Sequence, residues 1–131
     1  MQRHRILIVE DSPTMRQLLA FALKRIPGAE IVEARDGMDG LRKVTSDHFD
    51  LALVDINMPD IHGLEVIKLI RASPQHRTVP VIVISSEASP RDRERGLALG
   101  ADTWLAKPFT PEQLVDTVRR VLATPRAPEA T

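Results

Sequence analysis

Three short runs of almost purely apolar residues constrain this chain more than any other feature of its sequence. They occupy residues 6–9, 51–54 and 81–84, are rich in β-branched side chains and are bounded by polar or turn-forming residues. Strands that are apolar on both faces are buried on both faces, which is typical of parallel sheets. Residues 30–34, which alternate, and residues 103–106, a short run, predict two further strands nearer the edges.

Helical patterns fill the segments between these strands. Ser12 and Pro13 begin the first helix, and the segment from Thr110 to Gln113 begins the last one with a capping box. Three more helices are predicted at residues 37–44, 63–72 and 91–99. Five βα units imply right-handed crossovers and an open, doubly wound α/β sheet covered on both faces. The apolar face of the first helix is expected to hold Met15, Leu18, Leu19, Ala22, Leu23 and Ile26.

Size and charge narrow the possible functions. A chain of 131 residues fits one domain, which we place at residues 1–123, with the proline-containing residues 124–131 as a disordered tail or the start of a linker. Basic and acidic residues number 18 each, so there is no overall basic field for direct nucleic-acid binding. The apolar runs are too short for membrane insertion, and the absence of cysteine is compatible with a reducing compartment. We therefore expect a cytoplasmic protein.

Polar residues gather where the predicted strands end. Glu10 and Asp11 follow the first strand, Asp55 ends the third, Ser85 ends the fourth, and Lys107 follows the fifth. Ligands of open α/β sheets bind beyond the carboxyl ends of the strands, so these side chains are expected to converge. Ser86 competes with Ser85 for a role there.

Three converging carboxylates predict a cation site. They repel one another, and a hard divalent cation relieves that repulsion. Mg²⁺ suits a site with few carboxylates and several retained waters. A carboxylate can also attack phosphorus and form an acyl phosphate, and Asp55 is the best-placed nucleophile.

The chain resembles the receiver domain of two-component response regulators, most closely the stand-alone chemotaxis (CheY) type. The resemblance covers about residues 5–123 and implies a CheY-like, flavodoxin-like (βα)5 fold with strand order 2-1-3-4-5. The stretches that carry it are Ile6-Leu7-Ile8-Val9-Glu10-Asp11-Ser12, Leu53-Val54-Asp55-Ile56-Asn57-Met58-Pro59-Asp60 with Gly63, Val83-Ile84-Ser85-Ser86, Gly100-Ala101-Asp102 and Lys107-Pro108-Phe109.

What the resemblance implies for the site can be stated residue by residue. Asp55 is the phosphoacceptor, and Ser85 and Lys107 hold the phosphoryl oxygens. Mg²⁺ is bound by Asp11, Asp55 and the backbone carbonyl of Asn57, with Glu10 acting through water. The Lys107-Pro108 peptide bond is expected to be cis.

The resemblance also implies a signalling switch rather than an enzyme, because such a domain catalyses only its own phosphorylation and dephosphorylation. A sensor histidine kinase donates the phosphoryl group, and the surface of the fourth helix, fifth strand and fifth helix then controls an output protein, with a phosphatase as a possible further partner. Asn57 and Glu87 hold positions that tune dephosphorylation. Trp104 stands where the family usually has tyrosine or phenylalanine, and we interpret it as a rotameric switch or as a core aromatic.

Other functions fit the sequence less well. A flavin carrier of the same architecture needs small and hydroxyl residues in its first loop, where this chain has Glu10 and Asp11. An aspartyl phosphatase usually has a second acid where this chain has Asn57. A docking scaffold that is not phosphorylated, and a receiver module of a longer regulator with DNA-binding or enzymatic output, stay open as alternatives.

Overall fold

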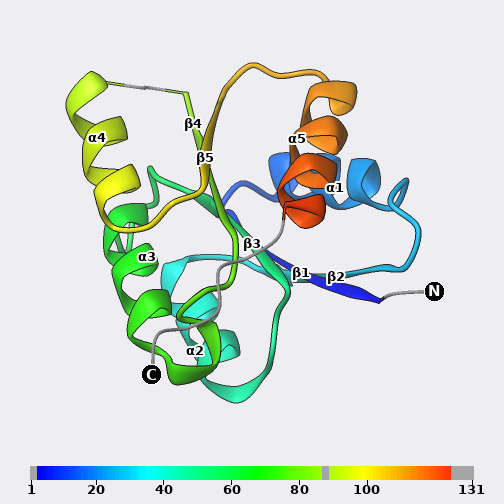
Figure 1. Ribbon diagram of the computed structural model, residues 1–131. Helices are drawn as coiled ribbons and strands as arrows, with labels where there is room; N and C mark the ends of the chain where they lie inside the picture. Colours follow the sequence, from blue (N-terminus) through cyan, green and yellow to red (C-terminus); the bar gives the residue numbers. More distant parts are fainter. Residues whose placement is uncertain (1–2, 87–88, 125–131) are drawn as a thin grey trace.

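The computed structural model describes residues 3–86 and 89–124. Strands and helices alternate along this part of the chain (Figure 1). The elements are β1 (His4–Val9), α1 (Pro13–Leu23), β2 (Ala29–Ala34), α2 (Gly37–Ser46), β3 (Leu51–Asp55), α3 (Gly63–Ala72), the 3₁₀ turn η1 (Pro74–His76), β4 (Val81–Ser85), α4 (Pro90–Ala98), β5 (Thr103–Ala106) and α5 (Pro111–Ala123).

The strands form one parallel sheet in the order β2-β1-β3-β4-β5, which confirms the predicted fold class and strand order. Val9 of β1 is in register with Val54 of β3. Ser85, the last residue of β4, is in register with Ala106, the last residue of β5. The carboxyl ends of β1, β3, β4 and β5 therefore lie along the same edge of the sheet.

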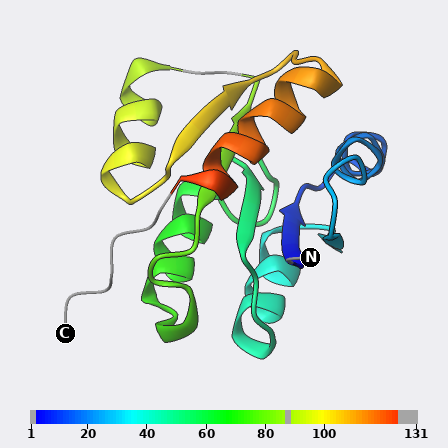
Figure 2. The same cartoon turned by 45° about the vertical axis from the view of Figure 1, so that its right-hand side comes forward.

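Helices cover both faces of the sheet, with α1 and α5 on one side and α2, α3 and α4 on the other (Figures 1 and 2). Successive residues of a strand point to opposite faces, so each central strand contributes to both cores. In β1, Ile6 and Ile8 pack in the cluster beneath α1 and α5, whereas Leu7 and Val9 pack in the cluster beneath α2, α3 and α4. This double burial explains the continuous apolar runs.

The predicted helix starts are confirmed by their hydrogen bonds. The Ser12 hydroxyl accepts a hydrogen bond from the Met15 backbone N–H at 3.3 Å. At the start of α5, the Thr110 hydroxyl accepts from the Gln113 N–H at 3.1 Å, and the Gln113 side chain accepts from the Thr110 N–H at 2.8 Å. This reciprocal pair is the capping box predicted from the sequence.

Two features of the helices differ from the prediction. Leu18, expected on the buried face of α1, is 58% exposed, because the helix buries only the narrower stripe that includes Leu19, Ala22 and Leu23. The helix also ends at Leu23, although Ile26 beyond it is still buried. The turn η1 was not predicted, because three residues are too few to show a periodic pattern.

Candidate functional site

The site lies at the carboxyl edge of the sheet, where the sequence predicted it. Carboxylate oxygens of Glu10, Asp11 and Asp55 lie within 4.8 Å of one another, and this is the one group of three or more potential metal ligands within residues 3–86 and 89–124. Glu10 and Asp55 are buried, with 1% and 4% of their surface exposed, and Asp11 is half-buried. The sheet register produces this cluster, because β1 and β3 end side by side.

The negative charge of the cluster changes the pKa of Asp11. Burial raises the pKa of Asp11, and a hydrogen bond to Glu10 and the negative charge of Glu10 raise it further. A shift of this kind means that the folded protein disfavours a third negative charge here. A hard cation bound to these oxygens would remove that penalty, so the donor set fits Mg²⁺.

Lys107 supplies positive charge from the end of β5. Its Nζ lies 3.1 Å from Oε1 of Glu10 and 3.6 Å from Oδ2 of Asp55. The Lys107 backbone N–H donates to the Ser85 carbonyl at 2.8 Å, which joins the ends of β4 and β5. The Lys107-Pro108 peptide bond is cis, as expected. The two Nζ distances place the ammonium inside the pocket, beside two buried acids.

The two buried acids are also held by backbone donors. The Ser12 N–H donates to Oε2 of Glu10 at 3.1 Å, and the Asn57 N–H donates to Oδ1 of Asp55 at 3.1 Å. Oδ1 of Asp55 is thus bound to its own loop, and Oδ2 faces Lys107. This fixes the orientation of the Asp55 carboxylate, with one oxygen directed at the ammonium.

Gly63 fixes the loop that follows Asp55. A Cβ atom at position 63 would lie 2.5 Å from Cα of Ile56 and 2.6 Å from the carbonyl oxygen of Asp55. No side chain fits there, so the start of α3 packs directly against the backbone of the site.

The remaining predicted residues are placed as follows. Ser85 is fully buried at the end of β4, whereas Ser86 is exposed. Trp104 is 9% exposed and belongs to the core beneath α2, α3 and α4. Glu87 lies outside the described residues. The structure thus brings Glu10, Asp11, Asp55 and Lys107 into one pocket with Ser85 at the end of the neighbouring strand, and the chemical roles of these residues stay predictions.

The sequence reasoning missed two residues that support the site. Arg16 donates to the Glu10 carbonyl at 2.9 Å and pairs with Glu33 of β2 at 3.3 Å, which ties the loop after β1 to α1. Asp60 accepts from the N–H groups of Gly37 and Met38 at 3.2 and 2.9 Å, which ties the loop after β3 to α2. Arg16 lies one turn after the helix cap, and this position could have indicated its contact with the loop before the helix. The contact of Asp60 with distant residues leaves no pattern in the sequence.

A parallel sheet in the order 2-1-3-4-5 with an acidic pocket at its carboxyl edge defines a flavodoxin-like α/β protein with the CheY fold. The sequence model of the response regulator receiver domain matches residues 6–119. The chain therefore belongs to the receiver domain family.

Known proteins with similar sequences and structures agree with this assignment. Chemotaxis protein CheY1 of Helicobacter pylori is 31% identical over 92% of this chain and 98% of that protein. The phosphate regulon transcriptional regulatory protein PhoB of Klebsiella pneumoniae is 36% identical over 90% of this chain, which spans only about half, 51%, of that protein. The structure of Vibrio cholerae chemotaxis protein CheY4 superimposes with a TM-score of 0.86 at 37% identity, covering 92% of this chain and 99% of that one.

Family membership carries general consequences. Receiver domains are signalling switches that bind Mg²⁺ at an acidic pocket, take phosphoryl groups from histidine kinases and act on output partners. None of the helices within the described part of the chain is long and apolar enough to cross a membrane.

Proposed function

We propose that Asp55 accepts a phosphoryl group from the phosphohistidine of a sensor histidine kinase. The observation that carries this proposal is the orientation of its carboxylate, which is buried in the acidic pocket with Oδ2 3.6 Å from the Lys107 ammonium. Oδ2 is the attacking atom. It forms a bond to phosphorus while the bond from phosphorus to the kinase histidine breaks, which leaves an acyl phosphate on Asp55.

Mg²⁺ binding is assigned to Asp11, Asp55 and the Asn57 carbonyl, with Glu10 acting through water. The ion, when bound, neutralises charge on the transferring phosphoryl group. The raised pKa of Asp11 and the approach of three carboxylates within 4.8 Å support this assignment. Lys107, which follows β5, adds a second positive charge to the pocket.

Lys107 and Ser85 are the residues that hold the phosphoryl oxygens. In phosphoryl transfer the protein contributes mainly positioning and charge stabilisation. The backbone hydrogen bond between these two residues keeps their strand ends together. Lys107 already contacts Asp55 and Glu10, so a phosphoryl group on Oδ2 would meet the ammonium within the same pocket.

The output surface is assigned to α4, β5 and α5. A partner responds to phosphorylation only if it discriminates between two conformers of this surface. Trp104 of β5 is the proposed switch residue, and the structure shows its indole in the buried position. Trp104 emission that stays constant when Mg²⁺ and beryllofluoride, a phosphoryl mimic, saturate the site would contradict a switching role.

We further propose chemotaxis-type signalling in the cytoplasm with a short-lived phosphoryl state. The likeness to CheY1 and CheY4 over nearly their whole length supports this pathway. Asn57 and Glu87 are the residues assigned to tuning hydrolysis, and a phosphatase is a candidate partner. The likeness to half of PhoB supports the alternative of a receiver module in a longer regulator.

Labelling with a small phosphodonor tests the proposed function. The wild type is expected to incorporate phosphate only when Mg²⁺ is present, and Asp55→Asn is expected to incorporate none. Equal labelling of both proteins would contradict the assignment of Asp55. Absence of labelling in the wild type would favour the docking scaffold instead.

A further inference from the structure

The packing of α4 on the sheet depends on one steric match. A Cβ atom at Gly96 would lie 2.8 Å from Cζ3 and 3.4 Å from Cε3 of Trp104, and 3.4 Å from Cδ2 of Leu64. Both tryptophan atoms belong to the six-membered ring of the indole, so this ring fills the space that a side chain at position 96 would need. Cβ atoms do not approach other heavy atoms as closely as 2.8 Å, so a side chain at position 96 would require the helix or the indole to shift.

The helix α4 buries little of its own surface. Within Pro90–Ala98, all of which the structure describes, Gly96 is the single buried residue. The exposed positions of the helix include Arg91, Arg93, Glu94 and Arg95, and Leu97 is also exposed. Burial of apolar surface is the main source of helix docking energy, so the indole beneath Gly96 largely determines where α4 sits.

The buried position of the indole has an energetic cost. Trp104 is 9% exposed, and its Nε1–H has no hydrogen-bond partner within the part of the chain that the structure describes. A buried donor without an acceptor loses its hydration and gains no hydrogen bond in return. If the indole turns outward, water can form a hydrogen bond with this N–H. The inward position is therefore favoured by a smaller free energy than it would be with a paired N–H.

We infer that Gly96 is a positioning residue that admits the indole of Trp104 and thereby sets the balance between its inward and outward positions. The missing side chain at residue 96 favours the inward indole, and the unpaired Nε1–H opposes it. Because α4 rests on the indole, this balance controls the arrangement of the α4–β5–α5 surface. The link to signalling output rests on the proposed function, whereas the steric match does not.

Fluorescence of Gly96→Ala tests the inference directly. The chain has one tryptophan, so the emission reports Trp104 alone. The added methyl group should displace the indole, which shifts the emission to longer wavelength and increases quenching by acrylamide. Glu94→Ala is the matched control on the exposed side of α4 and should leave the emission unchanged. An unchanged emission in Gly96→Ala would overturn the inference.

Melting temperatures in two backgrounds separate this specific fit from general helix effects. Alanine is the better helix former, so Gly96→Ala should raise Tm by about 3 °C where space is available. In the wild type, overpacking against Trp104 should instead lower Tm by about 3 °C or more. In a Trp104→Leu background, which lacks the six-membered ring, the same substitution should raise Tm. The same sign of change in both backgrounds would overturn the inference.

Rescue by a smaller aromatic ring completes the test. Trp104→Phe removes the part of the indole that meets Gly96, so the double variant Gly96→Ala, Trp104→Phe should melt above Gly96→Ala alone. A double variant that melts lower than Gly96→Ala would contradict the steric match. None of these measurements uses a phosphodonor. A failure of Asp55 labelling is therefore distinguishable from a failure of this inference.

Discussion

The ammonium of Lys107 lies 3.1 Å from the buried carboxylate of Glu10, although the two residues are separated by 97 positions in the sequence. This ion pair spans the pocket from the end of β5 to the end of β1. The same ammonium faces Oδ2 of Asp55. Lys107 therefore offsets negative charge on two buried acids in addition to its proposed role toward phosphate.

Replacing Lys107 should destabilise the fold. Lys107→Met leaves two buried carboxylates without this partner, so the free energy of unfolding in EDTA should fall by about 2 kcal/mol. Added Mg²⁺ should recover part of the loss by neutralising the same acids. Urea unfolding with and without Mg²⁺ measures both effects.

Lys68→Met, at an exposed position of α3, is the control and should change stability by less than about 0.5 kcal/mol. Equal effects of the two substitutions would contradict this account.

Replacing Asp11 should have the opposite effect in the absence of Mg²⁺. The pKa of Asp11 is raised in the folded protein, so its protonated form is favoured by folding, and the associated stability is lost as pH rises through the folded-state pKa. Asp11 therefore costs stability at pH 7. Asp11→Asn should raise Tm in EDTA and should weaken the rise in Tm that Mg²⁺ causes in the wild type. Thermal melts in EDTA and in Mg²⁺ check this, and a lower Tm of Asp11→Asn in EDTA would be evidence against it.

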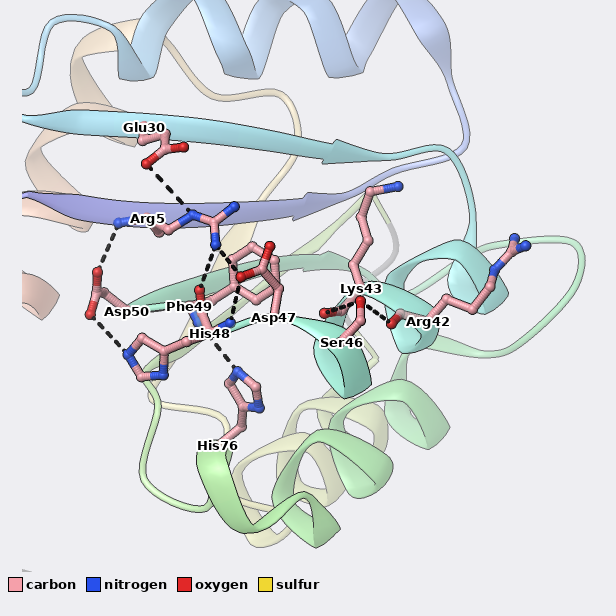
Figure 3. Close-up of polar contacts among 10 residues, drawn as sticks. All are labelled: Arg5, Glu30, Arg42, Lys43, Ser46, Asp47, His48, Phe49, Asp50 and His76. Atoms are coloured by element: carbon pink, nitrogen blue, oxygen red, sulfur yellow. Dashed lines mark hydrogen bonds and ion pairs between the residues drawn. The ribbon is translucent and has the colours of Figure 1, made fainter.

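His76 should make stability fall in mild acid. It is buried in η1, where its Nε2 accepts a hydrogen bond from the Phe49 N–H at 3.3 Å (Figure 3). Its Nδ1 lies 3.0 Å from the Ser73 hydroxyl. An Nε2 that accepts a hydrogen bond carries no proton, so this imidazole is neutral. Burial, followed by the nearby charge of His48, lowers the pKa of His76.

The sign of the pH effect follows from that shift. The unfolded chain takes up a proton near pH 6.5, about the usual histidine value, before the folded chain does, so stability is lost as pH falls below that point. The loss cannot exceed about 1.4 kcal/mol per pH unit for one proton. Urea unfolding between about pH 7 and pH 5 should show a smaller decline in His76→Gln than in the wild type. His4→Gln is the control and should decline as the wild type does. Parallel curves for His76→Gln and the wild type would contradict the prediction.

Arg71 should be among the residues most sensitive to substitution outside the pocket. Its guanidinium donates to the carbonyls of Val79 and Gly100 at 2.6 Å each and to that of His76 at 3.2 Å, and it lies 3.5 Å from Asp102. Arg71→Lys keeps the charge but cannot reproduce this planar set of donors. We expect a loss of about 2 kcal/mol by urea unfolding.

A control separates this network from general surface effects. Arg93→Lys changes an exposed arginine of α4 and should alter stability by less than about 0.5 kcal/mol. If Arg71→Lys is as mild as Arg93→Lys, the carbonyl contacts of Arg71 contribute little.

The sheet was predictable from the sequence because burial on both faces leaves a continuous apolar run, as in residues 51–54. The pocket was predictable because a parallel sheet places the carboxyl end of every strand on one edge. Glu10, Asp55 and Lys107 therefore converge independently of the loop conformations. The interior of α1 was less predictable. Leu18 fits the helical period but lies at the margin of the stripe that contacts the sheet, so it is exposed.

Contacts between segments far apart in the chain could not be predicted from the sequence patterns. The partners of Arg71 are mainly backbone carbonyls up to 29 positions away, and every residue type offers a carbonyl. The burial of His76 likewise depends on the 3₁₀ turn, which shows no period. The fit of Gly96 to Trp104 depends on the distance between α4 and β5, which is a tertiary quantity. All three features depend on how distant segments of the chain pack together.

The most direct test of the account is to locate the phosphoryl group. Borohydride reduces an aspartyl phosphate to homoserine, so treatment of the labelled protein marks the acceptor residue for peptide mass spectrometry. We predict homoserine at position 55 alone, formed only when the small phosphodonor and Mg²⁺ are both present. Homoserine at another aspartate, or none anywhere after incubation with donor and Mg²⁺, would contradict the claim that Asp55 is the phosphoacceptor.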